Sequence, residues 1–273
     1  MKQFIALFLI SVSVCCYGQP MNNKGQTKKA IICLTYDDAI ESQLYVAIPQ
    51  LDSLGFKGTF FMNSIKGSTE VMGIGEPHIL GWKKAAQNGH ELANHTLFHP
   101  CPEQFGWQKE LALERYSIDK MLKEIEITNL YLGMLDDTRK VRSFAFPCNN
   151  FAINGIDYVE RLRTTKLVTY ARGGGDRNSC VSVPDFKTVN IMKVPSWHVE
   201  EGTSLEELIA FAEKVKANGG LGIYQFHGID SPLFRISSKT HKRFLAYLKA
   251  NQNEYWVTTF SEAMDYVTDK ATK

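Results

Sequence analysis

The sequence predicts an α/β fold built on a mostly parallel sheet or barrel. Apolar runs of strand length alternate repeatedly with amphipathic helical segments, which is the pattern of parallel strands covered by helices. The chain has 273 residues, of which 22% are charged and 44% hydrophobic, and this fits one large domain. Acidic and imidazole side chains follow several of the predicted strands. Because the carboxyl ends of parallel strands meet, we expect these side chains to share one site.

The first residues predict a secretory signal peptide over residues 1–18. Lys2 precedes an apolar run from Phe4 to Val14, and small residues follow up to a plausible cleavage point. The run is too short to span a bilayer. We therefore expect an exported protein, periplasmic or secreted. Lipid anchoring at Cys15 or Cys16 is less favoured, because the residues before each cysteine fit a lipoprotein signal poorly.

Residues 19–29 are polar and predict a flexible N-terminal segment, and residues 30–273 predict a single domain. The formal net charge is +2, and no basic stripe interleaved with aromatic residues is present, so nucleic acid is not an expected partner. The sequence gives no indication of oligomeric state. Four cysteines lie beyond the signal peptide: Cys33, Cys101, Cys148 and Cys180. They form no Cys-x-x-Cys pair, and they allow either free thiols or up to two disulfides with three possible pairings.

Periodicity and turn residues place the elements. Strands are expected at 30–35, 58–62, 90–93, 141–147, 166–171, 221–226 and 256–257. Helices are expected at 44–51, 82–87, 111–125, 156–162, 205–215, 240–250 and 260–267. Pro49 predicts a kink or a late start in the first helix. Ser204 and Glu207 have the spacing of a capping box, and Gly219 ends the helix that follows it.

The segment Asn88 to Pro100 carries two imidazoles, His95 and His99, four residues apart. Pro100 disfavours helical backbone at the residue before it, which indicates a turn or loop rather than a long helix. Two imidazoles facing one point supply two nitrogen ligands for zinc. A catalytic zinc site needs one or two further donors and an open position.

An acidic pair, Asp37 and Asp38, follows the first predicted strand. Neighbouring residues of a regular strand point to opposite faces, so both carboxylates can serve one site only where the backbone turns after the strand. One carboxylate could then complete a metal site while the other acts as a base; the alternative is an N-cap for the next helix. His227 follows the strand at 221–226, and alone it would be read as structural. Together the three groups indicate one site.

These motifs resemble those of a known family. Thr35-Tyr36-Asp37-Asp38-Ala39 resembles the first motif of the polysaccharide deacetylases, the NodB homology group of carbohydrate esterase family 4. Gly89 to Pro100 closely resembles the second motif, and Phe226-His227-Gly228 the last. The resemblance runs from about Ala30 to Val267. It implies a distorted (β/α) barrel of mostly parallel strands and a metal-dependent hydrolase that removes acetyl groups from a carbohydrate.

The resemblance also implies roles for individual residues. One divalent metal ion, Zn²⁺ being favoured, would be held by Asp38, His95 and His99. The ion would activate a water molecule for attack on the N-acetyl group of a glycan containing N-acetylglucosamine. Asp37 would be the general base and His227 the general acid. A backbone N–H near Pro147 and Cys148 would help to hold the oxyanion.

The sequence departs from the family pattern at two places. The third motif normally contains an arginine that orients the base, but Ala145 stands at that position, so Arg172 or Arg142 would have to reach the site from elsewhere. Ser196 replaces the acidic residue that normally precedes the later tryptophan. That tryptophan, Trp197, is expected to pack against His227 or a sugar ring, or else in the core.

Two alternatives to an N-deacetylase remain. An O-acetyl esterase acting on xylan or a related polymer would use the same attack on an ester. A non-catalytic carbohydrate-binding protein could have kept the fold. The missing arginine favours the binding protein, whereas the presence of Asp37, the metal-binding triad and His227 favours an enzyme.

Overall fold

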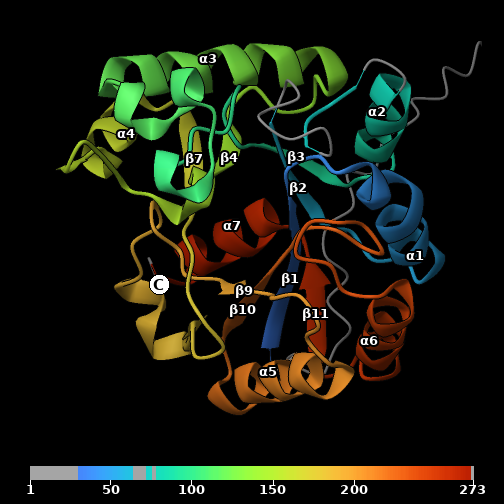
Figure 1. Ribbon diagram of the computed structural model, residues 1–273. Coiled ribbons are helices and arrows are strands. Elements are labelled where there is room, and N and C mark those ends of the chain that lie inside the picture. Colours follow the sequence, from blue (N-terminus) through green and yellow to red (C-terminus); the bar gives the residue numbers. More distant parts are fainter. Residues whose placement is uncertain (1–29, 64–71, 76–77, 272–273) are drawn as a thin grey trace, which may run out of the picture.

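The computed structural model describes residues 30–63, 72–75 and 78–271, and the predicted signal peptide and polar segment lie outside the described residues. A curled nine-stranded sheet has the order β7-β4-β3-β2-β1-β10-β8, with β11 also paired to β1 and β9 to β10 (Figure 1). All pairings are parallel except that of β8 with β10. The strands are β1 (Ala30–Asp37), β2 (Thr59–Met62), β3 (Glu91–Asn94), β4 (Arg142–Ala145), β7 (Val168–Arg172), β8 (Cys180–Val181), β9 (Trp197–His198), β10 (Leu221–Phe226) and β11 (Tyr255–Thr258).

The sheet is brought towards closure by an irregular segment before β9. Ala171 of β7 donates its N–H to the carbonyl of Ile191 at 2.9 Å and accepts from the N–H of Val194 at 2.9 Å. Three residues after Val194 the chain enters β9, which pairs with β10 near the other end of the sheet. The predicted distorted barrel of mostly parallel strands is therefore confirmed.

Helices cover the outside of the sheet and one end of its interior. They are α1 (Ile48–Ser53), α2 (Ile79–Gln87), α3 (Ile118–Leu135), α4 (Val159–Thr165), α5 (Leu205–Asn218), α6 (Ser238–Ala250) and α7 (Phe260–Ala271). In Figure 1, α3 covers the side of β3 and β4, whereas α5 and α6 lie at the opposite side of the sheet. Among the described residues, no helix combines the length and apolar character needed to cross a membrane.

Local capping explains where the helices begin. The predicted capping box is confirmed: Ser204 and Glu207 exchange hydrogen bonds at the start of α5, and Gly219 ends that helix with φ 63°. The prediction that a helix includes Leu111 is wrong. The helix begins at Ile118, because the Ser117 side chain accepts the N–H of Lys120, and short 3₁₀ turns occupy residues 103–115.

Two other helices begin at residues other than those predicted from the sequence. Helical backbone begins at Glu41 and passes through a π-helical turn over Gln43–Ala47 into α1, with Pro49 as the second residue of α1. Of the two outcomes predicted from Pro49, the late start is wrong; the irregularity found there is the π-helical turn just before the proline. The helix expected from residue 156 begins at Val159, because residues 152–157 form the two-stranded hairpin β5 (Ala152–Ile153) and β6 (Ile156–Asp157).

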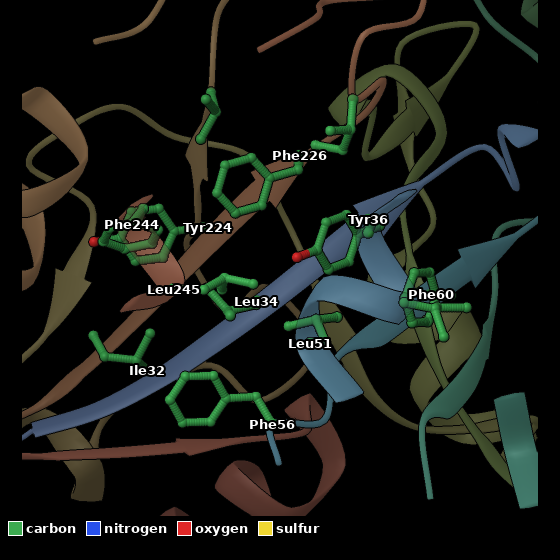
Figure 2. Packing of buried hydrophobic residues seen from close by; sticks show 14 of the residues in the cluster. Ile32, Leu34, Tyr36, Leu51, Phe56, Phe60, Tyr224, Phe226, Phe244 and Leu245 are labelled. Carbon is green, nitrogen blue, oxygen red and sulfur yellow. The ribbon is translucent and has the colours of Figure 1, made fainter. Parts of the chain in front are cut away.

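Successive side chains of β1 point alternately to the outer and inner faces of the sheet, and each face packs in a different apolar cluster. Ile32, Leu34 and Tyr36 point to the outer face and pack with side chains of α1, α6 and the neighbouring strands (Figure 2). Ile31 and Cys33 point to the inner face, where side chains of α7 pack against them. The same alternation continues to the end of the strand. The Asp37 side chain therefore lies on the inner face, next to the apolar cluster that Ile31 and Cys33 form with α7.

Candidate functional site

The chemically active side chains meet at the carboxyl ends of the parallel strands. Asp37 is the last residue of β1, His95 follows β3, Arg172 ends β7 and His227 follows β10. All four are buried, with at most 7% of each residue exposed. The convergence expected from the order of predicted strands is therefore present in the structure.

A backbone reversal turns the second aspartate toward the first. Asp38 has φ 79° and Ala39 has φ 50°, both in the left-handed region, and the Asp38 N–H donates to the carbonyl of Phe61 at 3.0 Å. Both aspartates consequently lie beside His95. The alternative that this pair caps the following helix is wrong, because Asp37 Oδ2 accepts from Arg172 and Gln225, and Oδ1 of each aspartate accepts no hydrogen bond.

Asp38, His95 and His99 form a group that fits a metal ion. One Asp38 oxygen, Oδ1, lies 3.2 Å from His99 Nε2 and 3.5 Å from His95 Nε2, and it has no hydrogen-bond partner. The three candidate ligand atoms lie within 4.8 Å of one another. The other ring nitrogens are occupied: His95 Nδ1 lies 2.8 Å from the Ala145 carbonyl, and His99 Nδ1 lies 3.5 Å from Cys101 Sγ. Both Nε2 atoms are thus oriented toward Asp38, as metal-binding imidazoles require.

The electrostatics of this group also suit a cation. Burial lowers the pKa of His95, and burial is also the main cause that lowers the pKa of His99 well below its usual range. Both shifts favour the neutral imidazole, which is the form that can ligate a metal. Burial and the neighbouring Asp37 raise the pKa of Asp38 well above its usual range. A divalent cation would favour the ionised form of Asp38 by direct charge compensation. The donor set therefore fits a divalent metal.

Asp37 is held by two donors on the same oxygen. Arg172 Nη2 donates to Asp37 Oδ2 at 2.6 Å, and Gln225 Nε2 donates to it at 3.0 Å. Asp37 Oδ1 has no hydrogen-bond partner. Burial acts to raise the pKa of Asp37, but the charge of Arg172, the nearby imidazoles and the arginine hydrogen bond outweigh it and lower that pKa. Asp37 is thus an oriented, ionised carboxylate with one oxygen available for a proton.

The arginine that contacts Asp37 is on β7, the neighbour of β4, where the family motif has its arginine. Ala145, where the family motif has its arginine, ends β4 and pairs directly with Arg172 of β7. The Arg172 guanidinium lies over the Phe61 ring at 4.8 Å and reaches Asp37 across the barrel mouth. Arg142, the other candidate, is turned away and pairs with Asp136 Oδ2 at 2.9 Å. The structure thus distinguishes the two arginines that the sequence left open.

His227 lies on the far side of the site in an aromatic setting. Its Nε2 is 3.9 Å from Asp38 Oδ2, and its Nδ1 has no hydrogen-bond partner. The rings of His198 and Phe234 pack against it with centroids 5.0 and 5.1 Å away. Burial is the main cause that lowers the pKa of His227 to about 3, so the imidazole is neutral at ordinary pH. Trp197 is not its neighbour: it packs in the core against Phe211 and Tyr224.

Three site residues were missed by sequence reasoning: Gln225, His198 and Trp107. Gln225 interrupts an apolar strand two residues before His227, and the period of two that places both on one face was a usable signal. His198 was one position away from the residue singled out. The Trp107 ring covers His99 with centroids 5.2 Å apart, but it lies in a loop for which no local pattern predicts a position.

The turn after β4 joins the site through a disulfide. Pro147, Cys148 and Asn149 form a 3₁₀ turn, and Cys148 is bonded to Cys101, two residues after His99. Of the pairings that the sequence allowed, this one forms, and Cys33 and Cys180 are free. The turn lies beside Ala145, whose carbonyl orients His95. The role of a Cys148 N–H in holding an oxyanion stays a prediction.

Comparison with known proteins assigns the family. The model of the polysaccharide deacetylase family matches residues 24–165, just over half of the chain. The chain belongs to the polysaccharide deacetylase family. A search of curated proteins gives no match. The matched region contains the first two motifs, and therefore Asp37, Asp38, His95 and His99.

Solved structures share the deacetylase fold. A putative polysaccharide deacetylase from Mycobacterium smegmatis has a TM-score of 0.63 at 16% identity, covering 93% of this chain and 94% of that one. A peptidoglycan N-acetylglucosamine deacetylase has a TM-score of 0.54 at 17% identity, covering 88% and 90%. A family 4 pseudoenzyme from Bacillus anthracis has a TM-score of 0.52 at 18% identity, covering 88% and 67%. At such identities the likeness shows the fold alone.

Proposed function

We propose that this chain is an active, metal-dependent deacetylase that hydrolyses N-acetyl groups of a glycan containing N-acetylglucosamine. The observation that carries the proposal is the 2.6 Å contact between Arg172 and Asp37, beside the group Asp38, His95 and His99. The absent motif arginine was the argument for a binding protein that had lost activity. A guanidinium in contact with the base weakens that argument. One structural neighbour is named as a peptidoglycan N-acetylglucosamine deacetylase, which supports the proposed substrate class.

The proposed metal is a single Zn²⁺ ion held by Asp38, His95 and His99, because two imidazoles and one carboxylate suit zinc and leave a position open. When bound, the ion would polarise the acetyl carbonyl and lower the pKa of a water molecule. We also propose export, on the signal peptide predicted at residues 1–18.

Asp37 acts as the general base through Oδ1. Its other oxygen is fixed by Arg172 and Gln225, so the carboxylate presents Oδ1, which has no other partner, to the attacking water. The lowered pKa keeps Asp37 ionised and ready to accept a proton. A carboxylate held in this way loses little orientational freedom on the way to the transition state.

His227 delivers a proton to the departing amine. It starts neutral, because burial lowers its pKa to about 3, and it takes up the proton that Asp37 removed from the water as negative charge develops on the acetyl oxygen. The proton is then held at Nε2, the nitrogen that faces the site, and passes to the sugar amine. The rings of His198 and Phe234 hold the imidazole in place and exclude water from one side of it.

The test is acetate release by the protein from residue 19 onward, loaded with zinc and with metal content measured. Substrates are chitooligosaccharides, peptidoglycan fragments and acetylated xylan, and Asp37→Asn and a chelated sample serve as controls. Acetate from an N-acetylglucosamine substrate supports the proposal. Acetate from acetylated xylan alone would replace it by the O-acetyl esterase. No acetate from any of them by a zinc-loaded sample would favour a carbohydrate-binding protein.

A further inference from the structure

The Cys101–Cys148 disulfide has no part in the proposed reaction, yet it contacts a proposed metal ligand. It joins residues 47 apart in sequence. Cys101 is completely buried, whereas Cys148 is exposed and open to reductants. Cys101 Sγ lies 3.5 Å from His99 Nδ1. The disulfide is therefore within reach both of solvent and of the candidate metal site.

His99 faces two sets of possible partners with its two ring nitrogens. Nε2 lies 3.2 Å from Asp38 Oδ1, and Nδ1 faces the sulfur of Cys101. A neutral imidazole has one nitrogen with a lone pair and one that carries hydrogen, so it ligates one metal ion at a time. A sulfur bonded in a disulfide is a poor ligand, because metals bind the thiolate. While the disulfide is intact, His99 can therefore ligate a metal only in the site with Asp38 and His95.

Breaking the disulfide would change that balance. His99, Cys101 and Cys148 offer one nitrogen and two sulfurs, with ligand atoms within 4.8 Å of one another. Two thiolates and an imidazole are a strong donor set for zinc or cobalt, stronger than one carboxylate and two imidazoles. We propose that the reduced chain has a second metal site at His99, Cys101 and Cys148, and that this site and the Asp38 site exclude each other because both require His99.

The reduction itself balances with an ordinary dithiol. Dithiothreitol supplies two electrons and two protons, the bond between the two sulfurs breaks, two thiols form, and the reductant becomes a cyclic disulfide. An oxidising compartment would keep the bond and hence the Asp38 site, and a reducing one would favour the second site. The inference goes beyond the deacetylase activity and rests on the proposed function only for the metal at Asp38.

Cobalt is the probe, because Co²⁺ bound to thiolate has a sulfur-to-metal charge-transfer band in the near ultraviolet. Oxidised and reduced chains are titrated with Co²⁺ in a Cys180→Ser background, which removes the half-buried free thiol, and the reductant is removed beforehand. We expect binding without the band in the oxidised chain and with the band in the reduced chain. His95→Ala should weaken Co²⁺ binding by roughly tenfold or more in the oxidised chain and leave the reduced band unchanged.

The control is the double variant Cys101→Ser/Cys148→Ser, with folding checked by circular dichroism. It should bind Co²⁺ without the band under both conditions. A reduced wild-type chain without the band, or a band that persists in the double variant, would overturn the inference. An oxidised chain that binds no Co²⁺, beside a reduced chain that shows the band, would instead overturn the proposed metal site of the deacetylase and leave this inference standing.

Discussion

Arg172→Met tests whether an arginine from β7 takes over the role of the absent motif arginine. The wild-type guanidinium contacts Asp37 at 2.6 Å, and neither side chain is more than 1% exposed. Methionine fills much of the volume but leaves the buried carboxylate with Gln225 as its remaining donor. Breaking one partner of a buried ion pair costs about 3–5 kcal/mol of stability. Loss of an oriented general base costs about 10²–10⁴-fold in kcat, and we expect a loss in the lower half of that range.

Arg142→Met is the matched control, because Arg142 is another completely buried arginine with a carboxylate partner, Asp136 at 2.9 Å, away from the site. Both variants should lose stability in thermal or urea unfolding, but only Arg172→Met should lose kcat per folded molecule. Zinc content should be unchanged in both variants, since neither arginine is among the candidate ligands. Initial rates of acetate release measure kcat.

The pH profile separates a role in tuning the base from a role in packing. Arg172 contributes to the lowered pKa of Asp37, so its removal raises that pKa. The acid limb of the kcat/KM profile should therefore move to higher pH in Arg172→Met and stay in place in Arg142→Met. A kcat for Arg172→Met within about twofold of wild type, or an acid limb that does not move, would refute the assignment of Arg172.

Three further outcomes follow from the structure. Asp37→Asn should retain stoichiometric zinc, measured by mass spectrometry, while kcat falls by about 10²–10⁴-fold; loss of zinc together with activity would contradict the division of roles between the two aspartates. Removal of metal by a chelator should abolish acetate release, and added Zn²⁺ should restore it, unless the reaction needs no metal. Fully buried His241, held by Tyr36 and Gln50, has a pKa lowered by burial to about 3. Below pH 6.5 the unfolded chain binds a proton at this histidine and the folded chain does not, so the free energy of unfolding falls by about 2 kcal/mol by pH 5. In His241→Gln, the free energy of unfolding measured with urea should depend less on pH over that range.

Elements whose signals are local could be predicted from the sequence. The strand ending at Asp37 begins as a continuous apolar run, the strand ending before His227 is apolar except for Gln225, and the Ser204 capping box acts within a few residues. Errors occurred where tertiary contacts decide the outcome. The start of α3 depends on Ser117, and the loop before it is fixed by long-range contacts such as the Leu113 N–H to the Cys101 carbonyl at 2.9 Å. Periodicity carries no information on such contacts.

Some residues of the candidate site could likewise be predicted from local sequence, and others depend on tertiary structure. Asp37, Asp38, His95 and His99 lie in short contiguous motifs, so their convergence could be predicted from strand order alone. The choice of Arg172 over Arg142 could not, because it depends on which face of the curled sheet each side chain occupies. The Cys101–Cys148 pairing was one of several that the sequence allowed, and it depends on the 5.7 Å separation of their Cα atoms in the folded chain.

The position of Arg172 bears on how a family member is judged active or inactive. Orientation of Asp37 requires a donor at one point in space, not at one place in the sequence. Ala145 and Arg172 are direct partners on adjacent strands, and an arginine side chain is long enough to cross the spacing between strands of about 4.8 Å. An arginine on β7 rather than on β4 therefore supplies the charge and the hydrogen bond at Asp37 without the motif arginine. A member of the family that lacks the motif arginine can thus keep a guanidinium in contact with Asp37, and that contact decides whether the proposed base is oriented.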